Sequence, residues 1–75
     1  MKTVIIGAGQ VGYNLAEQLI LEKRDVVLIE RDPARAEYAT AHLDCMVIRG
    51  EGNNMDDIRR AGTADADFFV AATDS

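Results

Sequence analysis

Three glycines, Gly7, Gly9 and Gly12, are the residues of this 75-residue chain whose spacing is best suited to chemistry. They form Gly-x-Gly-x-x-Gly, directly after the apolar run Val4–Ile6 and at the start of an amphipathic helical pattern. Gly7 allows a sharp turn off a strand, Gly9 lets backbone N–H groups approach a pyrophosphate, and Gly12 lets the helix lie close to the strand. Because unpaired N–H groups at a helix start favour an anion, the stretch predicts a phosphate-binding turn. The alternative is a tight turn that binds no ligand.

An acidic residue follows the glycine motif at a spacing along the sequence that suits ribose binding. Glu30 ends a second apolar run and lies 18 residues after Gly12. At about this spacing, an acidic residue accepts hydrogen bonds from an adenosine ribose. A carboxylate there also repels a 2′-phosphate, which favours NAD or an adenine nucleotide over NADP. Arg31 could flank the adenine ring or offset part of this repulsion, and the alternative for Glu30 is a solvated charge at a strand end.

The rest of the chain alternates short apolar runs with helical patterns, which is typical of an α/β fold. The predicted strands are Val4–Ile6, Val26–Glu30, Cys45–Ile48 and Phe68–Ala72. The predicted helices are Gln10–Glu22, one from Pro33 to Ala41–Leu43, and a short one between Asn53 and Gly62. Right-handed crossovers give the β-α-β-α-β-α-β chain the strand order 3-2-1-4, which is a Rossmann-like, partial doubly wound parallel sheet.

Small and apolar residues mark the sheet-facing sides of these helices. In the first helix they are Ala8, Gly12, Leu15, Ala16 and Leu19. In the second they are Ala36, Ala39, Thr40 and Leu43, and in the third Met55, Ile58 and Ala61. Asp32 is placed to cap the second helix, and Pro33 suits its first position. Cys45 is expected to be a small buried hydrophobic residue.

Composition limits the functional classes. The formal net charge is −5 and the basic residues are scattered, which argues against nucleic-acid binding. No apolar stretch is long enough to span a membrane and no signal-peptide pattern is present, so we expect a cytosolic location. The single Cys45 excludes an internal disulfide, and His42 has no ligand partner at metal-binding spacing. We therefore assign neither a catalytic residue nor a metal site.

Several segments occur in the same order in a known family. They are Ile5–Gly12, the strand ending in Glu30, Arg49–Gly52, Ile58–Gly62 and Ala64–Ser75. With them the chain resembles the N-terminal nucleotide-binding domain of Trk-type potassium-uptake regulators, the RCK or KTN family. The resemblance covers essentially the whole chain. Its more specific parts are the Gly-Glu-Gly turn and the Ala-Asp-Ala-Asp…Ala-Thr-Asp-Ser segment. We expect residues 1–75 to be the N-terminal, truncated part of such a domain, because a complete doubly wound domain needs roughly twice this length.

The resemblance implies a regulatory role rather than an enzyme. Members are cytosolic subunits that form dimers and gating rings beneath a potassium channel or transporter, and NAD(H), ATP or ADP shifts their conformation. It implies a cytoplasmic protein held at the inner face of the membrane by its partner, without direct membrane insertion. By motif match it places Gly7, Ala8, Gly9, Gln10 and Val11 at the phosphates and Glu30, beside Arg31, at the ribose. It places Glu51, Gly52, Thr73 and Asp74 around the adenosine side.

Two departures from the family pattern and two alternatives remain. The family more often has Asp at the position of Glu30, and a Gly or Asn where Lys23-Arg24 closes the first helix. The main alternative function is the cofactor-binding half of an NAD-dependent oxidoreductase, whose catalytic residues would lie beyond Ser75. The other alternative is a fragment that associates without any ligand.

Overall fold

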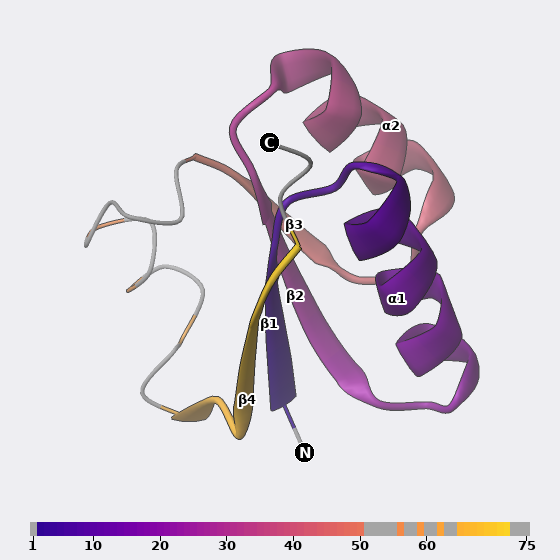
Figure 1. Cartoon of the computed structure of the whole chain (residues 1–75), viewed down its shortest axis with the longest axis vertical. Coiled ribbons are helices and arrows are strands. Elements are labelled where there is room, and N and C mark those ends of the chain that lie inside the picture. Colours follow the sequence, from indigo (N-terminus) through magenta and orange to yellow (C-terminus); the bar gives the residue numbers. More distant parts are fainter. Residues whose placement is uncertain (1, 51–55, 57–58, 60–61, 63–64, 73–75) are drawn as a thin grey trace.

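The computed structural model describes residues 2–50, 56, 59, 62 and 65–72, and in this part of the chain four strands alternate with two helices (Figure 1). The elements follow in the order β1 (Lys2–Ile6), α1 (Gln10–Leu21), β2 (Asp25–Glu30), α2 (Pro33–His42), β3 (Met46–Arg49) and β4 (Phe68–Ala71). The long predicted helices and all predicted strands are therefore present, with ends that differ by one or two residues.

The strands form one parallel sheet in the order β3-β2-β1-β4, which confirms the predicted order. Both α1 and α2 cover the same face of this sheet (Figure 1). This follows from right-handed crossovers, because the steps from β1 to β2 and from β2 to β3 run in the same direction. The fold is thus α/β and Rossmann-like.

The core has two layers, one on each face of the sheet. Under the helices, Ile5 and Leu28 are fully buried and pack with Ala16 and Ala39. On the opposite face, Val4, Val27, Ile29 and Ile48 form a second cluster. Strands buried on both faces need apolar residues at consecutive positions, which explains why β1 and β2 read as unbroken apolar runs.

Most of the residues predicted to lie on the sheet-facing sides of the helices are buried or partly buried. Gly12, Ala16, Ala36, Ala39 and Leu43 are buried, and Leu15 and Leu19 are partly buried. The prediction for Thr40 is wrong, because Thr40 is exposed. It lies on the flank of α2 beside the edge strand β3, where the sheet ends and cannot cover it. Its hydroxyl donates to the carbonyl oxygen of Ala36 (2.8 Å).

Helix α1 ends without glycine but with the backbone that glycine usually provides. Lys23 has φ 61°, its N–H donates to Ile20 O (2.9 Å), and the N–H of Arg24 donates to Leu19 O (3.0 Å). These two bonds form a Schellman motif, in which the left-handed residue is glycine in most helices. The sequence pattern did not predict this motif, because a lysine carries no signal for a positive φ.

The starts and ends of the later elements differ slightly from expectation. β3 begins at Met46, so Cys45 precedes the strand and is half-buried rather than buried. Burial raises the pKa of the Cys45 thiol, and the nearby Asp44 adds to this effect. Asp56 and Arg59 are helical, and Gly62 has φ 70° with its N–H donating to Arg59 O (3.0 Å), as expected at a helix end. The predicted positions Asn53, Met55, Ile58 and Ala61 lie outside the described residues.

The left-handed backbone at Lys23 predicts a stabilising substitution. Lys23→Gly removes the Cβ clash of the left-handed conformation and should raise the free energy of unfolding by about 1 kcal/mol. Urea denaturation, monitored by circular dichroism, measures this change in the free energy of unfolding. Glu22→Gly is the matched control, because Glu22 has φ −84° and gains nothing from glycine. If both variants lower the midpoint, the assigned conformation at Lys23 is wrong.

Candidate nucleotide-binding site

The glycine turn after β1 is held by its own backbone. Gly7 has φ 106°, a region that residues with a Cβ rarely adopt, and its N–H donates to the carbonyl oxygen of Ile29 in β2 (2.7 Å). The turn therefore leaves β1 sharply but remains attached to the neighbouring strand. This geometry is the role predicted for the first glycine.

Gly12 brings α1 against the same turn. A methyl group on Gly12 would overlap the Gly7 carbonyl oxygen and would lie 2.9 Å from the Gly7 carbonyl carbon. It would also lie 3.4 Å from the side chain of Ala72, directly after β4. Only a residue without a side chain allows this approach, so the role predicted for the third glycine is confirmed.

The amino end of α1 opens at the glycine turn. Gly9 is the N-cap, with φ −67° and ψ −173°, and its carbonyl oxygen accepts from Tyr13 N–H (2.8 Å). As a glycine, the N-cap has no side chain with which to cap this end. Among the residues that the structure describes, none accepts a hydrogen bond from the N–H groups of Gly9, Gln10 or Val11. Unpaired N–H groups and the positive end of a helix dipole together favour an anion.

Glu30 is the buried charged residue of the site, with 5% of its surface exposed. Its Oε1 accepts from Ala8 N–H (2.6 Å), and its Oε2 accepts from Asp32 N–H (2.7 Å). Its carbonyl oxygen accepts from Gly50 N–H (2.9 Å), just after β3. Glu30 thus connects the glycine turn, the start of α2 and the end of β3. It is not the solvated strand-end charge that the sequence also allowed.

The residues after Glu30 start α2 as predicted. Asp32 is the N-cap and its Oδ2 accepts from Arg35 N–H (2.9 Å), while Pro33 occupies the first turn. Arg31 is exposed between Glu30 and this cap. The side chain of Arg31 therefore lies at the surface.

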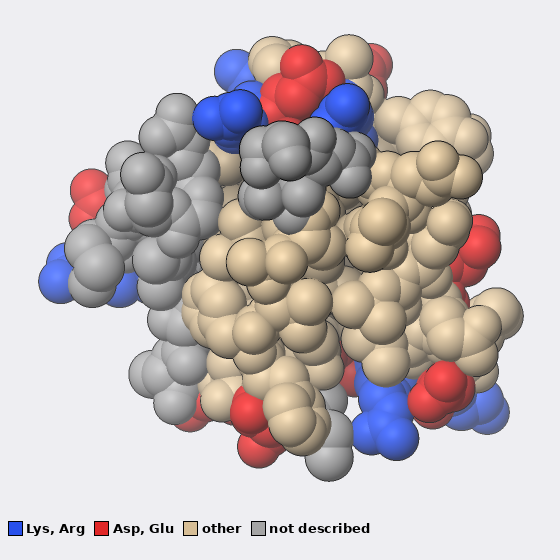
Figure 2. Space-filling model, viewed as in Figure 1, with Lys and Arg blue, Asp and Glu red and all other residues tan. Residues whose placement is uncertain are grey.

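Arg49, which is not among the ligand residues that the family resemblance implies, is a neighbour of Glu30 in the sheet. The parallel register pairs Glu30 with Arg49 at the carboxyl ends of β2 and β3. A signal was present, because each is the charged residue that ends its apolar strand, but the register depends on the three-dimensional pairing. Figure 2 shows side chains of both charge signs where the strands end, whereas the face over β4 and α1 is largely uncharged.

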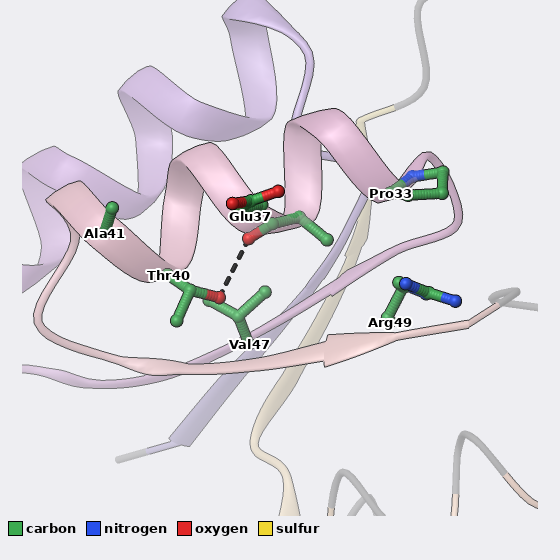
Figure 3. Close-up of a pocket in the computed structure, with 7 residues that line it drawn as sticks. Pro33, Glu37, Thr40, Ala41, Val47 and Arg49 are labelled. Atoms are coloured by element: carbon green, nitrogen blue, oxygen red, sulfur yellow. Dashed lines mark hydrogen bonds between the residues drawn. The ribbon is translucent and has the colours of Figure 1, made fainter.

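A groove of about 480 Å³ runs between α2 and β3, beside this charged end. Its walls are mostly small or apolar, and Figure 3 shows Arg49 near Pro33 at one end and Thr40 above Val47. The lining residues are Pro33, Ala36, Glu37, Thr40, Ala41, Val47 and Arg49. The groove therefore borders the Glu30 site without containing Glu30 itself.

The remaining sequence-predicted residues fall into two groups. Glu51, Gly52, Thr73 and Asp74 lie outside the described residues. His42 is near the end of α2, where its Nδ1 lies 2.7 Å from Tyr38 O and its ring stacks on Tyr38 at 4.0 Å. Within the described ranges, no three His, Cys, Asp or Glu residues could share a metal ion, and no helix is long and apolar enough to cross a membrane.

A parallel 3-2-1-4 sheet, a Gly-x-Gly-x-x-Gly turn and a buried acidic residue at the end of β2 define a Rossmann-type nucleotide-binding domain. The chain belongs to the TrkA-N domain family, whose pattern matches residues 3–75. It is 44% identical over 73 residues to the Trk system potassium uptake protein TrkA of Azorhizobium caulinodans, covering 97% of this chain. It is 45% identical over 73 residues, again 97% of this chain, to a TrkA homolog of Archaeoglobus fulgidus.

These relatives are much longer than the chain. It spans 16% of the Azorhizobium and Archaeoglobus proteins. A TrkA homolog of Methanothermobacter thermautotrophicus is 42% identical over 73 residues, which cover 97% of this chain. The chain spans 34% of the length of that relative. The comparison therefore concerns only a part of each relative.

The close approach at Gly12 predicts a large effect of one methyl group. Gly12→Ala should lower the free energy of unfolding by about 2 kcal/mol, because the added carbon overlaps the Gly7 carbonyl group. Urea denaturation measures the change. Asn14→Ala, at an exposed position of the same helix, is the control and should leave the midpoint within about 0.5 kcal/mol of wild type. If Gly12→Ala unfolds at the wild-type midpoint, the close approach of Gly12 to the Gly7 carbonyl group is wrong.

Proposed function

We propose that the chain is a regulatory module that binds NAD(H) or an adenine nucleotide and controls a potassium channel or transporter. The observation that carries this proposal is the buried Glu30 carboxylate beside the N–H groups that open α1, for which no described residue is an acceptor. Together they offer a ribose acceptor and a phosphate site at the carboxyl ends of the strands. In open α/β sheets, ligands bind in this position.

The phosphates are assigned to the second half of the turn. The N–H groups of Gly7 and Ala8 already donate to Ile29 O and Glu30 Oε1. Those of Gly9, Gln10 and Val11 remain for a diphosphate, with the helix dipole behind them. Gly7 and Ala8 then shape the turn rather than bind the ligand through their N–H groups.

The ribose is assigned to Glu30. A carboxylate oxygen can accept more than one hydrogen bond, so Oε1 and Oε2 can each accept a ribose hydroxyl in addition to the present N–H. A 2′-phosphate would bring negative charge against a buried carboxylate, which favours NAD(H), ATP or ADP over NADP. Arg31 and Arg49 border this position and set the electrostatic balance at its edge. Glu51, Gly52, Thr73 and Asp74 remain proposed contacts on the adenosine side.

The regulatory role draws on the relatives, which are named as potassium uptake proteins of the Trk system. On this proposal the chain acts in the cytoplasm as part of a dimer or ring and reaches the membrane through a transporter or channel subunit. It binds the nucleotide without transforming it. Ligand binding changes the balance of two assembly states only if the affinities for the two states differ.

Calorimetric titration with NAD, NADH, ATP and ADP tests the proposal. We expect saturable binding of at least one nucleotide, with a raised unfolding midpoint; a ligand at 100 times its Kd stabilises by about 2.7 kcal/mol. Gly9→Val is the matched variant. Gly9 has a negative φ (−67°) that valine can also adopt, so the fold should survive, but the side chain should block the phosphates and abolish binding.

Three outcomes would contradict these assignments. An unfolding midpoint unmoved by all four nucleotides would favour a module that associates without ligand. Normal affinity in Gly9→Val would exclude the assigned backbone approach to the phosphates. Steady loss of NADH absorbance with candidate oxidants would support the oxidoreductase alternative.

Glu30→Ala tests the ribose assignment. It should weaken NAD binding about ten-fold and narrow the preference for NAD over NADP, because both the acceptor and the repulsive charge are removed. Competition binding with the two dinucleotides measures this ratio. Asp25→Asn, at the exposed start of the same strand, changes the net charge equally and should leave the ratio unchanged. An unchanged ratio in Glu30→Ala would remove Glu30 from the site.

A further inference from the structure

Glu30 makes two hydrogen bonds that require no ligand. Its carboxylate accepts from Ala8 N–H at 2.6 Å and from Asp32 N–H at 2.7 Å, one bond for each oxygen. Both bonds are short and charge-assisted, and the residue is almost fully buried. The carboxylate therefore ties the glycine turn after β1 to the first residues of α2.

The glycine turn needs such anchors because glycine does not restrict its own backbone. On its amino side, Gly7 N–H is held by the carbonyl oxygen of Ile29. The next N–H, that of Ala8, is held by the side chain of Glu30, the next residue of β2. Consecutive residues of β2 thus fix consecutive N–H groups of the turn. The direction of the following N–H groups, from Gly9 to Val11, follows from these two anchors.

We propose that Glu30 is a positioning residue for the phosphate-binding turn as well as a ribose acceptor. It holds Ala8 N–H and so aims the N–H groups of Gly9, Gln10 and Val11 at a diphosphate. This inference rests on the proposed function and deepens it. The affinity for a nucleoside diphosphate therefore depends on Glu30 even when the ligand has no ribose hydroxyl for Glu30 to bind.

Only a carboxylate can make both bonds. Glutamine has nearly the same shape, but it offers one acceptor oxygen and turns an NH₂ group toward the other N–H donor. Glu30→Gln therefore fills the same volume while losing one of the two bonds. A role in packing alone would be rescued by glutamine, and so would most of a role in ribose recognition, because glutamine can still bond a hydroxyl.

Calorimetric titration with ADP and 2′,3′-dideoxy-ADP separates the two roles. Glu30→Gln should weaken the binding of both ligands by about ten-fold, since the turn loses a charge-assisted hydrogen bond in either case. Asp25→Asn, the charge-matched control on the same strand, should weaken neither. Weaker ADP binding with unchanged 2′,3′-dideoxy-ADP binding would restrict Glu30 to the ribose and overturn the proposal.

A second measurement uses the unmodified chain. Nuclear magnetic resonance of the isotope-labelled, ligand-free protein should show a scalar coupling across the hydrogen bond between the Ala8 amide nitrogen and the Glu30 side-chain carboxyl carbon. The coupling should persist with either ligand bound. Because this measurement uses the wild-type chain, it tests the proposal even if the Glu30→Gln variant does not fold. Its absence from the free protein, or its loss on binding 2′,3′-dideoxy-ADP, would overturn the proposal.

The two proposals fail in different ways. If wild type binds none of NAD, NADH, ATP and ADP, the nucleotide-binding function is wrong and the positioning role falls with it, whatever the coupling shows. If wild type binds ADP but the free protein lacks the coupling, the nucleotide-binding function stands and only the positioning role is wrong.

Discussion

The contact between the backbone of Gly12 and the carbonyl group of Gly7 is the constraint on which the site depends. It presses the first turn of α1 onto the turn that leaves β1, so the helix must begin where the strand ends. The same contact brings α1 against Ala72 and hence against the end of β4. The N–H groups of the helix start are thereby placed at the edge of the sheet where β1, β2 and β4 end together.

The fold could be predicted in most respects because its causes are local. Continuous apolar runs, a capping Asp32 followed by Pro33, and a glycine motif at a strand end each specify an element or its boundary. The order 3-2-1-4 then follows from the handedness of crossovers. Thr40 was predicted to face the sheet because helical spacing alone does not reveal where the sheet ends. Lys23 adopts a left-handed backbone that its side chain does nothing to indicate.

The site could be predicted less completely, because its decisive contacts join distant segments. The sequence pattern identified Glu30 and the glycines, but it did not predict that Ala8 N–H is already taken by the Glu30 carboxylate. That bond depends on the side-chain direction at the end of β2. The proximity of Arg49 depends on the register between β2 and β3, which no spacing along the chain specifies. Residue types thus indicated the chemistry, while pairing between strands determined which donors remain for a ligand.

The sheet register also bears on how the chain reaches this structure. β1 pairs with β2 between residues such as Lys2 and Asp25, but with β4 between residues as distant as Thr3 and Phe68. Closing the longer loop costs about 1 kcal/mol more in chain entropy, so the β1-α1-β2 unit is the favoured nucleus. Until β4 docks, one side of β1 has no neighbour, although Val4 and Ile5 become fully buried in the finished fold. The strand that carries the glycine turn is therefore open to mispairing until β4 docks.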